Sequence, residues 1–213
     1  MTKIILSLET KESLDIIPYL GKYIDGVKIN HLLWNELDFD VEEAKELFVD
    51  FKLWDTPNTV KTVVESIIKK GGTMTTISTF NNEKVFDELE QYKDDIKLLA
   101  VTYLTSWNRD EQYQICREMP DFMWRRHLSR VKGFYGVVCS AQDIGMLSGA
   151  DKSLKRVCPG ITYGNNNSGQ VRTTTPKEAQ DLGADYIVIG RAITESENPL
   201  ETLKQIRNSP ITQ

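Results

Sequence analysis

Eight short apolar runs alternate with amphipathic stretches along this chain, and that alternation constrains the fold more than any other sequence feature. Strands that alternate with helices form parallel sheets, because each helix carries the chain back to the edge where the previous strand began. Eight such units predict an α/β fold, a (β/α)8 TIM barrel, with a doubly wound open sheet as the competing architecture. The predicted strands are Lys3–Leu8, Gly26–Ile29, Leu47–Lys52, Met74–Ile77, Lys97–Thr102, Gly133–Cys139, Leu154–Cys158 and Tyr186–Ile189.

Helices are predicted between these runs. The clearest is Thr59–Lys70, where apolar residues recur at helical spacing. Pro57 stands where its first turn would begin, and Gly71 follows its last residue. No linker or low-complexity tract divides the chain, so we expect one compact domain over residues 1–213. Further helical candidates are Asn82–Gln91, Asp110–Leu128, Pro176–Leu182 and Pro199–Asn208.

Composition excludes some classes of function. The formal net charge is -5 and 27% of residues are charged, which suggests neither a nucleic-acid-binding nor a membrane-binding surface. An anionic ligand would therefore need a locally positive pocket. No apolar run reaches the ~18 residues that mark a membrane-spanning helix.

The three cysteines are widely separated and include no C-x-x-C pair for a metal or redox site. Cys139 and Cys158 end apolar runs, which predicts small core residues in a reducing compartment. The apolar part of the N-terminus, Ile4-Ile5-Leu6, is too short for a signal peptide. We therefore expect a cytoplasmic protein.

A charged cluster begins within the third predicted strand, where Asp50-Phe51-Lys52-Leu53-Trp54-Asp55 places three charges within six residues. Successive side chains of a strand alternate between faces, so Asp50 and Lys52 should point the same way, with Asp55 just beyond the strand. A lysine between two carboxylates stays protonated and can serve as a positioned proton donor. An exposed ion-pair network is the alternative interpretation of this pattern.

Polar residues also follow other predicted strands, and in such a barrel the active site lies at the carboxyl ends of the strands. The first strand ends in Ser7-Leu8-Glu9 and the second in Lys28-Ile29-Asn30. They would add a carboxylate and a lysine to the cluster of the third strand. The fifth strand runs into Thr102-Tyr103-Leu104-Thr105-Ser106.

The last two strands predict a phosphate site. The seventh ends in Cys158-Pro159-Gly160 and the eighth in Ile189-Gly190-Arg191. Glycine allows close backbone approach, helix N-terminal amides face the anion, and arginine offers a charged fork for phosphate oxygens. The glycine- and asparagine-rich segment Ile161–Gln170 is predicted to be a mobile lid, with an ordinary surface loop as the alternative.

Taken together, these motifs resemble a known family. Asp50-x-Lys52-x-x-Asp55-x-Pro57-Asn58-Thr59 resembles the signature of orotidine 5′-phosphate decarboxylases, and the segment from Ala184 to Thr194 resembles that family's closing strand. Supporting matches, in family order, are Val27-Lys28, Leu104-Thr105-Ser106, the segment from Gly136 to Ala141, Pro159-Gly160-Ile161, and Gln170-x-Arg172 followed by Thr175-Pro176.

The resemblance implies decarboxylation of orotidine 5′-monophosphate to uridine 5′-monophosphate without metal or cofactor, the last step of pyrimidine nucleotide synthesis. It implies that Lys52 donates a proton to C6 of the pyrimidine and that Asp50 lies against the departing carboxylate. Lys28 would bind a ribose hydroxyl. Asp55 and Thr59 would reach into the active site of a neighbouring subunit, which implies a homodimer.

The resemblance also assigns the remaining substrate contacts. Thr105 would contact the pyrimidine, Gln170 would bridge base and phosphate, and Gly190 with Arg191 would hold the phosphate. The other substrate-binding candidates are Glu9, Pro159, Gly160 and Thr162.

Some residues depart from the family pattern. Glu9 stands where the family usually has aspartate, Thr162 where arginine is customary, and Trp54 where histidine is common. The histidine that usually follows the fourth strand is absent. The only histidines, His31 and His127, are assigned no catalytic role.

Two other functions are compatible with parts of this sequence. A magnesium-dependent sugar-phosphate decarboxylase or aldolase of the same suprafamily would share the D-x-K-x-x-D motif, but those relatives carry an acidic metal ligand where this chain has Lys28. Their Ala-Gly after the motif is here Thr56-Pro57. A catalytically inactive nucleotide-binding barrel is the other alternative, suggested by Glu9 and Thr162.

Overall fold

Eight parallel strands close into a barrel, each paired with the next along the chain and the last with the first. This computed structural model describes residues 2–36, 45–117, 120–131, 133–149, 152–164 and 172–208. The closed barrel confirms the predicted TIM-barrel class and rules out the open sheet. The strands are β1 (Lys3–Ser7), β2 (Gly26–Ile29), β3 (Leu47–Leu53), β4 (Met74–Ser78), β5 (Lys97–Val101), β6 (Gly136–Val138), β7 (Lys155–Cys158) and β8 (Tyr186–Ile189).

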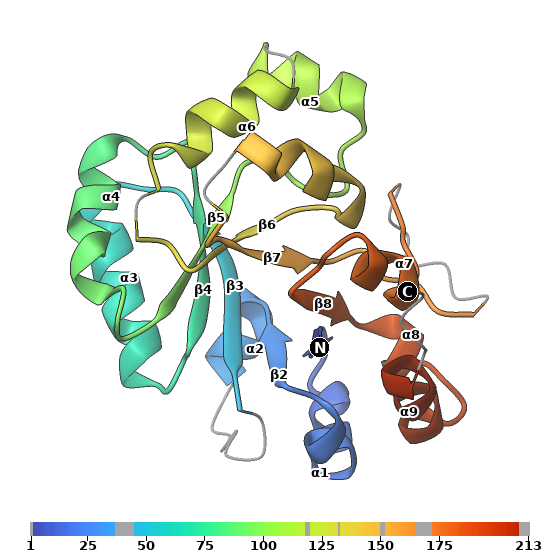
Figure 1. Cartoon of the computed structure of the whole chain (residues 1–213). Helices are drawn as coiled ribbons and strands as arrows, with labels where there is room; N and C mark the ends of the chain where they lie inside the picture. The colour runs from blue at the N-terminus through green and yellow to red at the C-terminus, as the bar shows by residue number, and fades with distance from the viewer. Residues whose placement is uncertain are drawn as a thin grey trace.

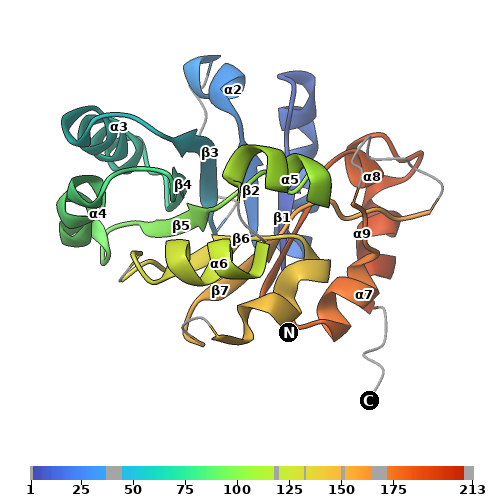
Figure 2. The same cartoon turned by 90° about the horizontal axis from the view of Figure 1, so that it is seen from above.

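Helices surround the strands, as Figure 1 and the view from above in Figure 2 show. Their bounds are α1 (Ile17–Leu20), α2 (His31–Glu36), α3 (Pro57–Lys69), α4 (Glu83–Leu89), α5 (Arg109–Cys116), α6 (Pro120–Leu128), α7 (Pro176–Asp181), α8 (Arg191–Thr194) and α9 (Pro199–Asn208). Short 3-10 helices are η1 (Glu12–Ile16), η2 (Gly21–Tyr23), η3 (Glu90–Tyr92) and η4 (Ala141–Gly149).

Helix α3 forms where its sequence predicts. Pro57 occupies the first turn, and Val60, Val64 and Ile67 turn one apolar stripe toward the barrel. Gly71, with a φ of 83°, follows its end in the left-handed conformation that glycine adopts easily. The helix therefore begins immediately after the charged cluster of β3 and fixes the direction in which the chain leaves it.

The apolar core has two layers. Inside the barrel, side chains from alternating strand positions pack together, among them Ile5, Phe48, Met74, Leu99, Val157, Tyr186 and Val188. A larger layer fills the space between strands and helices and contains Cys139 and Cys158, which are free, buried thiols. The prediction that these two cysteines are core residues is confirmed.

Several predicted boundaries were wrong. The sixth strand covers only Gly136–Val138, since Gly133 has a φ of 77° and interrupts extended structure. The helix expected over Asp110–Leu128 is two helices: Arg117 caps α5 with a φ of 54°, and Pro120 starts α6. Helices α1, α2 and α8 were not predicted. Each spans six residues or fewer, which is too short for a periodic apolar pattern to show in the sequence.

Within the described ranges, no helix combines the length and the apolar character needed to cross a membrane.

Candidate active site

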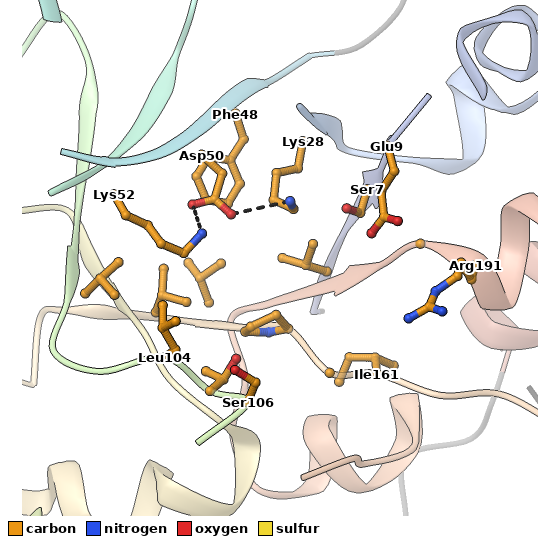
Figure 3. Close-up of a pocket in the computed structure, with 18 of the residues that line it drawn as sticks. Ser7, Glu9, Lys28, Phe48, Asp50, Lys52, Leu104, Ser106, Ile161 and Arg191 are labelled. Carbon is orange, nitrogen blue, oxygen red and sulfur yellow. Dashed lines mark hydrogen bonds and ion pairs between the residues drawn. The ribbon is translucent and has the colours of Figure 1, made fainter. Parts of the chain in front are cut away.

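A cavity of about 340 Å³ opens at the carboxyl ends of the strands, and residues in or just after seven of the eight strands, all but β4, line it (Figure 3). Most of the predicted site residues are brought together there. Those that line the cavity are Glu9, Lys28, Asp50, Lys52, Thr105, Pro159, Gly160, Gly190 and Arg191.

Asp50 is the centre of a charged array at one end of this cavity (Figure 3). Its Oδ1 lies 2.9 Å from Nζ of Lys52, and its Oδ2 lies 3.3 Å from Nζ of Lys28. The carboxylate is 14% exposed, whereas the Lys52 side chain is 42% exposed and so reaches the open part of the cavity. Three members of the predicted array, Lys28, Asp50 and Lys52, are therefore together in the structure.

Electrostatics keep Asp50 ionised. Burial acts to raise its pKa, but the charges of Lys28 and Lys52 and hydrogen bonds from Lys52 and Thr76 together outweigh it. The pKa of Asp50 therefore lies below its ordinary value, so that at neutral pH the cavity presents a fixed carboxylate between two ammonium groups.

Strand β3 is irregular at this array, which simple alternation did not predict. Its register with β4 shifts between Val49 and Leu53, and Lys52 has a φ of 51°. Phe51 and Leu53 do pack outward against the larger core layer, as expected. The irregularity is a bulge, a device that redirects side chains near active sites.

Asp55 does not join the array, contrary to the expectation that Lys52 lies between two carboxylates. Within the described part of this chain, Asp50 is the one carboxylate within ion-pair distance of Lys52. The Asp55 carboxylate turns back and accepts a hydrogen bond of 2.6 Å from the Thr56 amide, while its own N–H donates to Asn81. Thr59, in the first turn of α3, shares a 2.9 Å hydrogen bond with Thr56. Neither Asp55 nor Thr59 lines the cavity.

The other end of the cavity has the features of an anion site. Gly160 follows β7 with a φ of 77°, and Gly190 precedes Arg191, whose guanidinium lies away from the Asp50 array in Figure 3. A Cβ on Gly190 would lie 3.3 Å from both Cβ and the carbonyl oxygen of Ser7, so a larger residue would crowd β1. The charged array belongs to β2 and β3, whereas Gly160 and Arg191 belong to the segments after β7 and β8.

The segment after β7 is fastened at its base. The Thr162 amide donates to the Thr174 carbonyl at 3.0 Å, and the Thr174 amide donates to the Gly160 carbonyl at 3.1 Å. Thr162 is not among the lining residues. Gln170 and most of the predicted lid lie outside the described residues.

Arg172 ties this base to neighbouring elements. Its guanidinium forms a two-pronged ion pair with Asp143 of η4, at 2.8 and 2.5 Å, and its Nε donates to the Thr105 carbonyl at 3.3 Å. The Tyr103 hydroxyl donates to Asp143 at 3.4 Å and accepts from the Trp124 indole at 2.6 Å. We refer to Arg172, Asp143 and Tyr103 as the Arg172 clamp. Arg172 and Asp143 lie 29 residues apart, so no local pattern indicated the pairing.

Sequence reasoning missed other residues of the site. Ser7 lines the cavity two positions before Glu9, and Thr76 contacts both Asp50 and Lys52. Strand alternation could have indicated both, because Ser7 and Thr76 lie on the inward faces of β1 and β4. His127 of α6 is buried, and its Nδ1 lies 2.9 Å from the Thr79 hydroxyl just after β4. An imidazole thus reaches the end of β4 from another element.

Comparison with known sequences gives a consistent result. The sequence model described as "Orotidine 5'-phosphate decarboxylase / HUMPS family" matches residues 2–206. An orotidine 5′-phosphate decarboxylase of Wolbachia pipientis subsp. Culex pipiens (strain wPip) is 40% identical over 76% of this chain and 75% of its own length. The protein of that name from Actinobacillus pleuropneumoniae serotype 5b (strain L20) is 34% identical over 97% of this chain and 98% of its own.

Solved structures share the barrel. The crystal structure of orotidine 5′-phosphate decarboxylase from Lactobacillus acidophilus has a TM-score of 0.76 and 26% identity, and the match covers 97% of this chain and 98% of that one. The protein of the same name from Pyrococcus horikoshii OT3 has a TM-score of 0.75 and 23% identity over 95% and 96% of the two chains, which supports the fold alone.

Proposed function

This chain belongs to the orotidine 5′-phosphate decarboxylase / HUMPS family, and on that basis we propose that it converts orotidine 5′-monophosphate to uridine 5′-monophosphate and CO2. This reaction is the last step of de novo uridine 5′-monophosphate synthesis.

The separation of charge in the cavity carries this proposal. Lys28, Asp50 and Lys52 lie toward one end, and Arg191 lies toward the other (Figure 3). Orotidine 5′-monophosphate has anionic groups at its two ends, a carboxylate on the base and a 5′-phosphate. The cavity is lined by three cationic side chains and two carboxylates, so its net charge suits an anion. Its volume of about 340 Å³ suits a single small molecule.

We assign the chemistry to the charged array. The bond between C6 and the carboxylate carbon breaks, CO2 leaves, and the electron pair that remains at C6 takes a proton from Nζ of Lys52. Asp50 is assigned a place against the substrate carboxylate, where its charge would favour departure of CO2. Lys28, fixed by its 3.3 Å ion pair with Asp50, is assigned to a ribose hydroxyl.

The remaining contacts divide between base and phosphate. Thr105 is assigned to the pyrimidine, and Gly190 with Arg191 to the phosphate. Pro159, Gly160 and Glu9 also line the cavity, and we assign them to the sugar and phosphate. Gln170 is assigned a bridge between base and phosphate on the family resemblance alone, since it lies outside the described residues.

We further propose a homodimer in which Asp55 and Thr59 of each subunit complete the other subunit's site. Three observations support it: Asp55 does not reach its own chain's array, Trp54 beside it is 71% exposed, and the ring of Phe80 lies 6.3 Å from that of Trp54. An exposed aromatic pair at a site rim is typical of a surface that another protein covers. We infer that the second copy of this chain covers it.

The magnesium-dependent sugar-phosphate reaction is the alternative within this family name. Both oxygens of Asp50 are engaged by ammonium groups, and Lys28 stands where the sugar-phosphate relatives would carry a metal ligand. This arrangement favours the nucleotide decarboxylase.

A turnover assay tests the proposal. The purified protein should consume orotidine 5′-monophosphate, measured as loss of its ultraviolet absorbance, with uridine 5′-monophosphate as product. Exhaustive chelation should leave the rate unchanged, whereas the sugar-phosphate alternative would require added magnesium. Lys52→Ala should keep the fold and lose activity by more than the ~10²–10⁴-fold typical of a lone proton donor, because Lys52 acts within a coupled array. A Lys52→Ala rate within about tenfold of the unmodified protein would refute its role.

A further inference from the structure

One buried hydroxyl connects the backbone of Lys52 to the carboxylate of Asp50. The Lys52 amide donates a hydrogen bond of 2.8 Å to Oγ1 of Thr76, and that hydroxyl donates one of 2.9 Å to Oδ1 of Asp50. Thr76 lies in β4 and is fully buried. A hydroxyl can donate one hydrogen bond while it accepts another, so both contacts form together.

The bulge in β3 explains why this hydroxyl is needed. Val49 pairs with Thr75 and Leu53 with Ile77, so three residues of β3 face one residue of β4, which is Thr76. A bulge interrupts the regular ladder of backbone hydrogen bonds. The Thr76 side chain supplies an acceptor for the Lys52 amide, in a segment where the φ of Lys52 is 51°, a conformation that side-chain-bearing residues seldom adopt.

We propose that Thr76 is a positioning residue for decarboxylation, holding the Lys52 backbone and the Asp50 carboxylate in the arrangement that brings both charged groups into the cavity. This inference rests on the proposed function of the same site. Thr76 is not among the cavity-lining residues and acts through Lys52 and Asp50.

Three variants test whether the Thr76 hydroxyl itself is responsible for the effect. Thr76→Val removes the hydroxyl at nearly constant volume, and Thr76→Ser retains it. Thr75→Val is the matched control, because Thr75 is equally buried in the same strand and its hydroxyl donates a 2.9 Å hydrogen bond to the Val49 carbonyl, a backbone group, and not to a charged side chain. Each variant is first compared with the unmodified protein for thermal unfolding and for binding of uridine 5′-monophosphate by calorimetry.

Thr76→Val should lower kcat by about 10–100-fold, since a small displacement of a catalytic group has an effect of this size. KM and the affinity for uridine 5′-monophosphate should change by less than about threefold, because the residues that bind substrate remain in place. Thr76→Ser and Thr75→Val should keep kcat within about threefold of the unmodified protein.

The pH profile gives a second measurement. Asp50 faces Lys28 of β2 and Lys52 of β3, Glu9 and Arg191 line the same cavity, and β4 contributes no ionisable side chain. Loss of a hydrogen bond to the ionised carboxylate raises the pKa of Asp50. The acidic limb of kcat should therefore move to higher pH in Thr76→Val and stay in place in Thr75→Val.

The inference is overturned if Thr76→Val keeps kcat within about threefold of the unmodified protein, or if Thr76→Ser or Thr75→Val is as slow as Thr76→Val. It is also overturned if the acidic limb does not move in Thr76→Val. If the unmodified protein does not turn over orotidine 5′-monophosphate at all, the proposed function fails, and this inference fails with it.

Discussion

At the scale of single residues, Lys52 combines an exposed charged group with an unfavourable backbone conformation. Its φ of 51° lies in the left-handed region, where a Cβ costs about 1–2 kcal/mol. Such conformations concentrate at functional sites, where the surrounding structure enforces them. The bulge of β3 and the hydrogen bond to Thr76 enforce it here.

This strain predicts an order of stability among Lys52 variants. Lys52→Ala and Lys52→Gly both remove the ammonium group, but glycine relieves the left-handed strain. We expect Lys52→Gly to be more stable to unfolding than Lys52→Ala by about 1 kcal/mol, measured by denaturant titration. Lys70→Ala and Lys70→Gly form the control pair, because Lys70 has an ordinary negative φ of -93° and alanine should be at least as stable there. Equal stabilities of the two Lys52 variants would contradict the strain.

A separate prediction concerns Arg191, because this residue is assigned to the phosphate, the end of the substrate that does not react. Arg191→Ala should lower kcat/KM for orotidine 5′-monophosphate severely, since remote binding energy contributes to transition-state stabilisation. A truncated substrate that lacks the phosphate should be turned over almost equally well by the variant and the unmodified protein. Steady-state kinetics with both substrates measures this difference, and equal losses for the two would assign Arg191 a structural role.

At the scale of elements, the Arg172 clamp joins the segment after β5, helix η4 and the base of the segment after β7. Asp143 is 3% exposed and Arg172 13% exposed, so the ion pair is largely removed from water. Removal of one partner from a buried ion pair typically costs about 3–5 kcal/mol. The clamp therefore both stabilises the rim and holds the Thr105 wall of the cavity.

Asp143→Asn should lower the free energy of unfolding by about 3 kcal/mol and raise KM several-fold, because Thr105 loses its support. Asp185→Asn is the control. Asp185 pairs with Lys155 at 3.2 Å and Arg156 at 3.4 Å just before β8, at the opposite end of the barrel. That variant should lose stability with KM unchanged. An unchanged KM in Asp143→Asn would limit the clamp to a structural role.

At the scale of the whole molecule, the site is predicted to need two chains. If Asp55 serves the partner's array, each active site takes Lys52 from one chain and Asp55 from the other. Lys52→Ala and Asp55→Ala should each be nearly inactive alone. In a mixed dimer, one site has both lesions and the other has neither.

Co-refolding the two inactive variants should therefore restore about a quarter of the unmodified activity when subunits pair at random. Mass measurement of the mixed dimers is the control for assembly. Mixed dimers that form but remain inactive would assign Asp55 to its own chain's site.

The sequence by itself determined the barrel and most members of the site. Alternation of strands and helices is a local pattern, and in a parallel barrel the ends of successive strands necessarily meet on one rim. The approximate positions of Glu9, Lys28, Asp50, Lys52, Gly160 and Arg191 therefore followed from the strand assignments and the family resemblance.

Only the tertiary structure decided how those residues are supported. The bulge at Lys52 depends on pairing with β4, the Arg172–Asp143 pair joins residues far apart in the chain, and His127 reaches the end of β4 from α6. The orientation of Asp55, turned back onto Thr56 and away from Lys52, was likewise not predicted. Periodicity describes which face a residue occupies, whereas register shifts and long-range hydrogen bonds arise when separate elements pack together, so no local pattern encodes them.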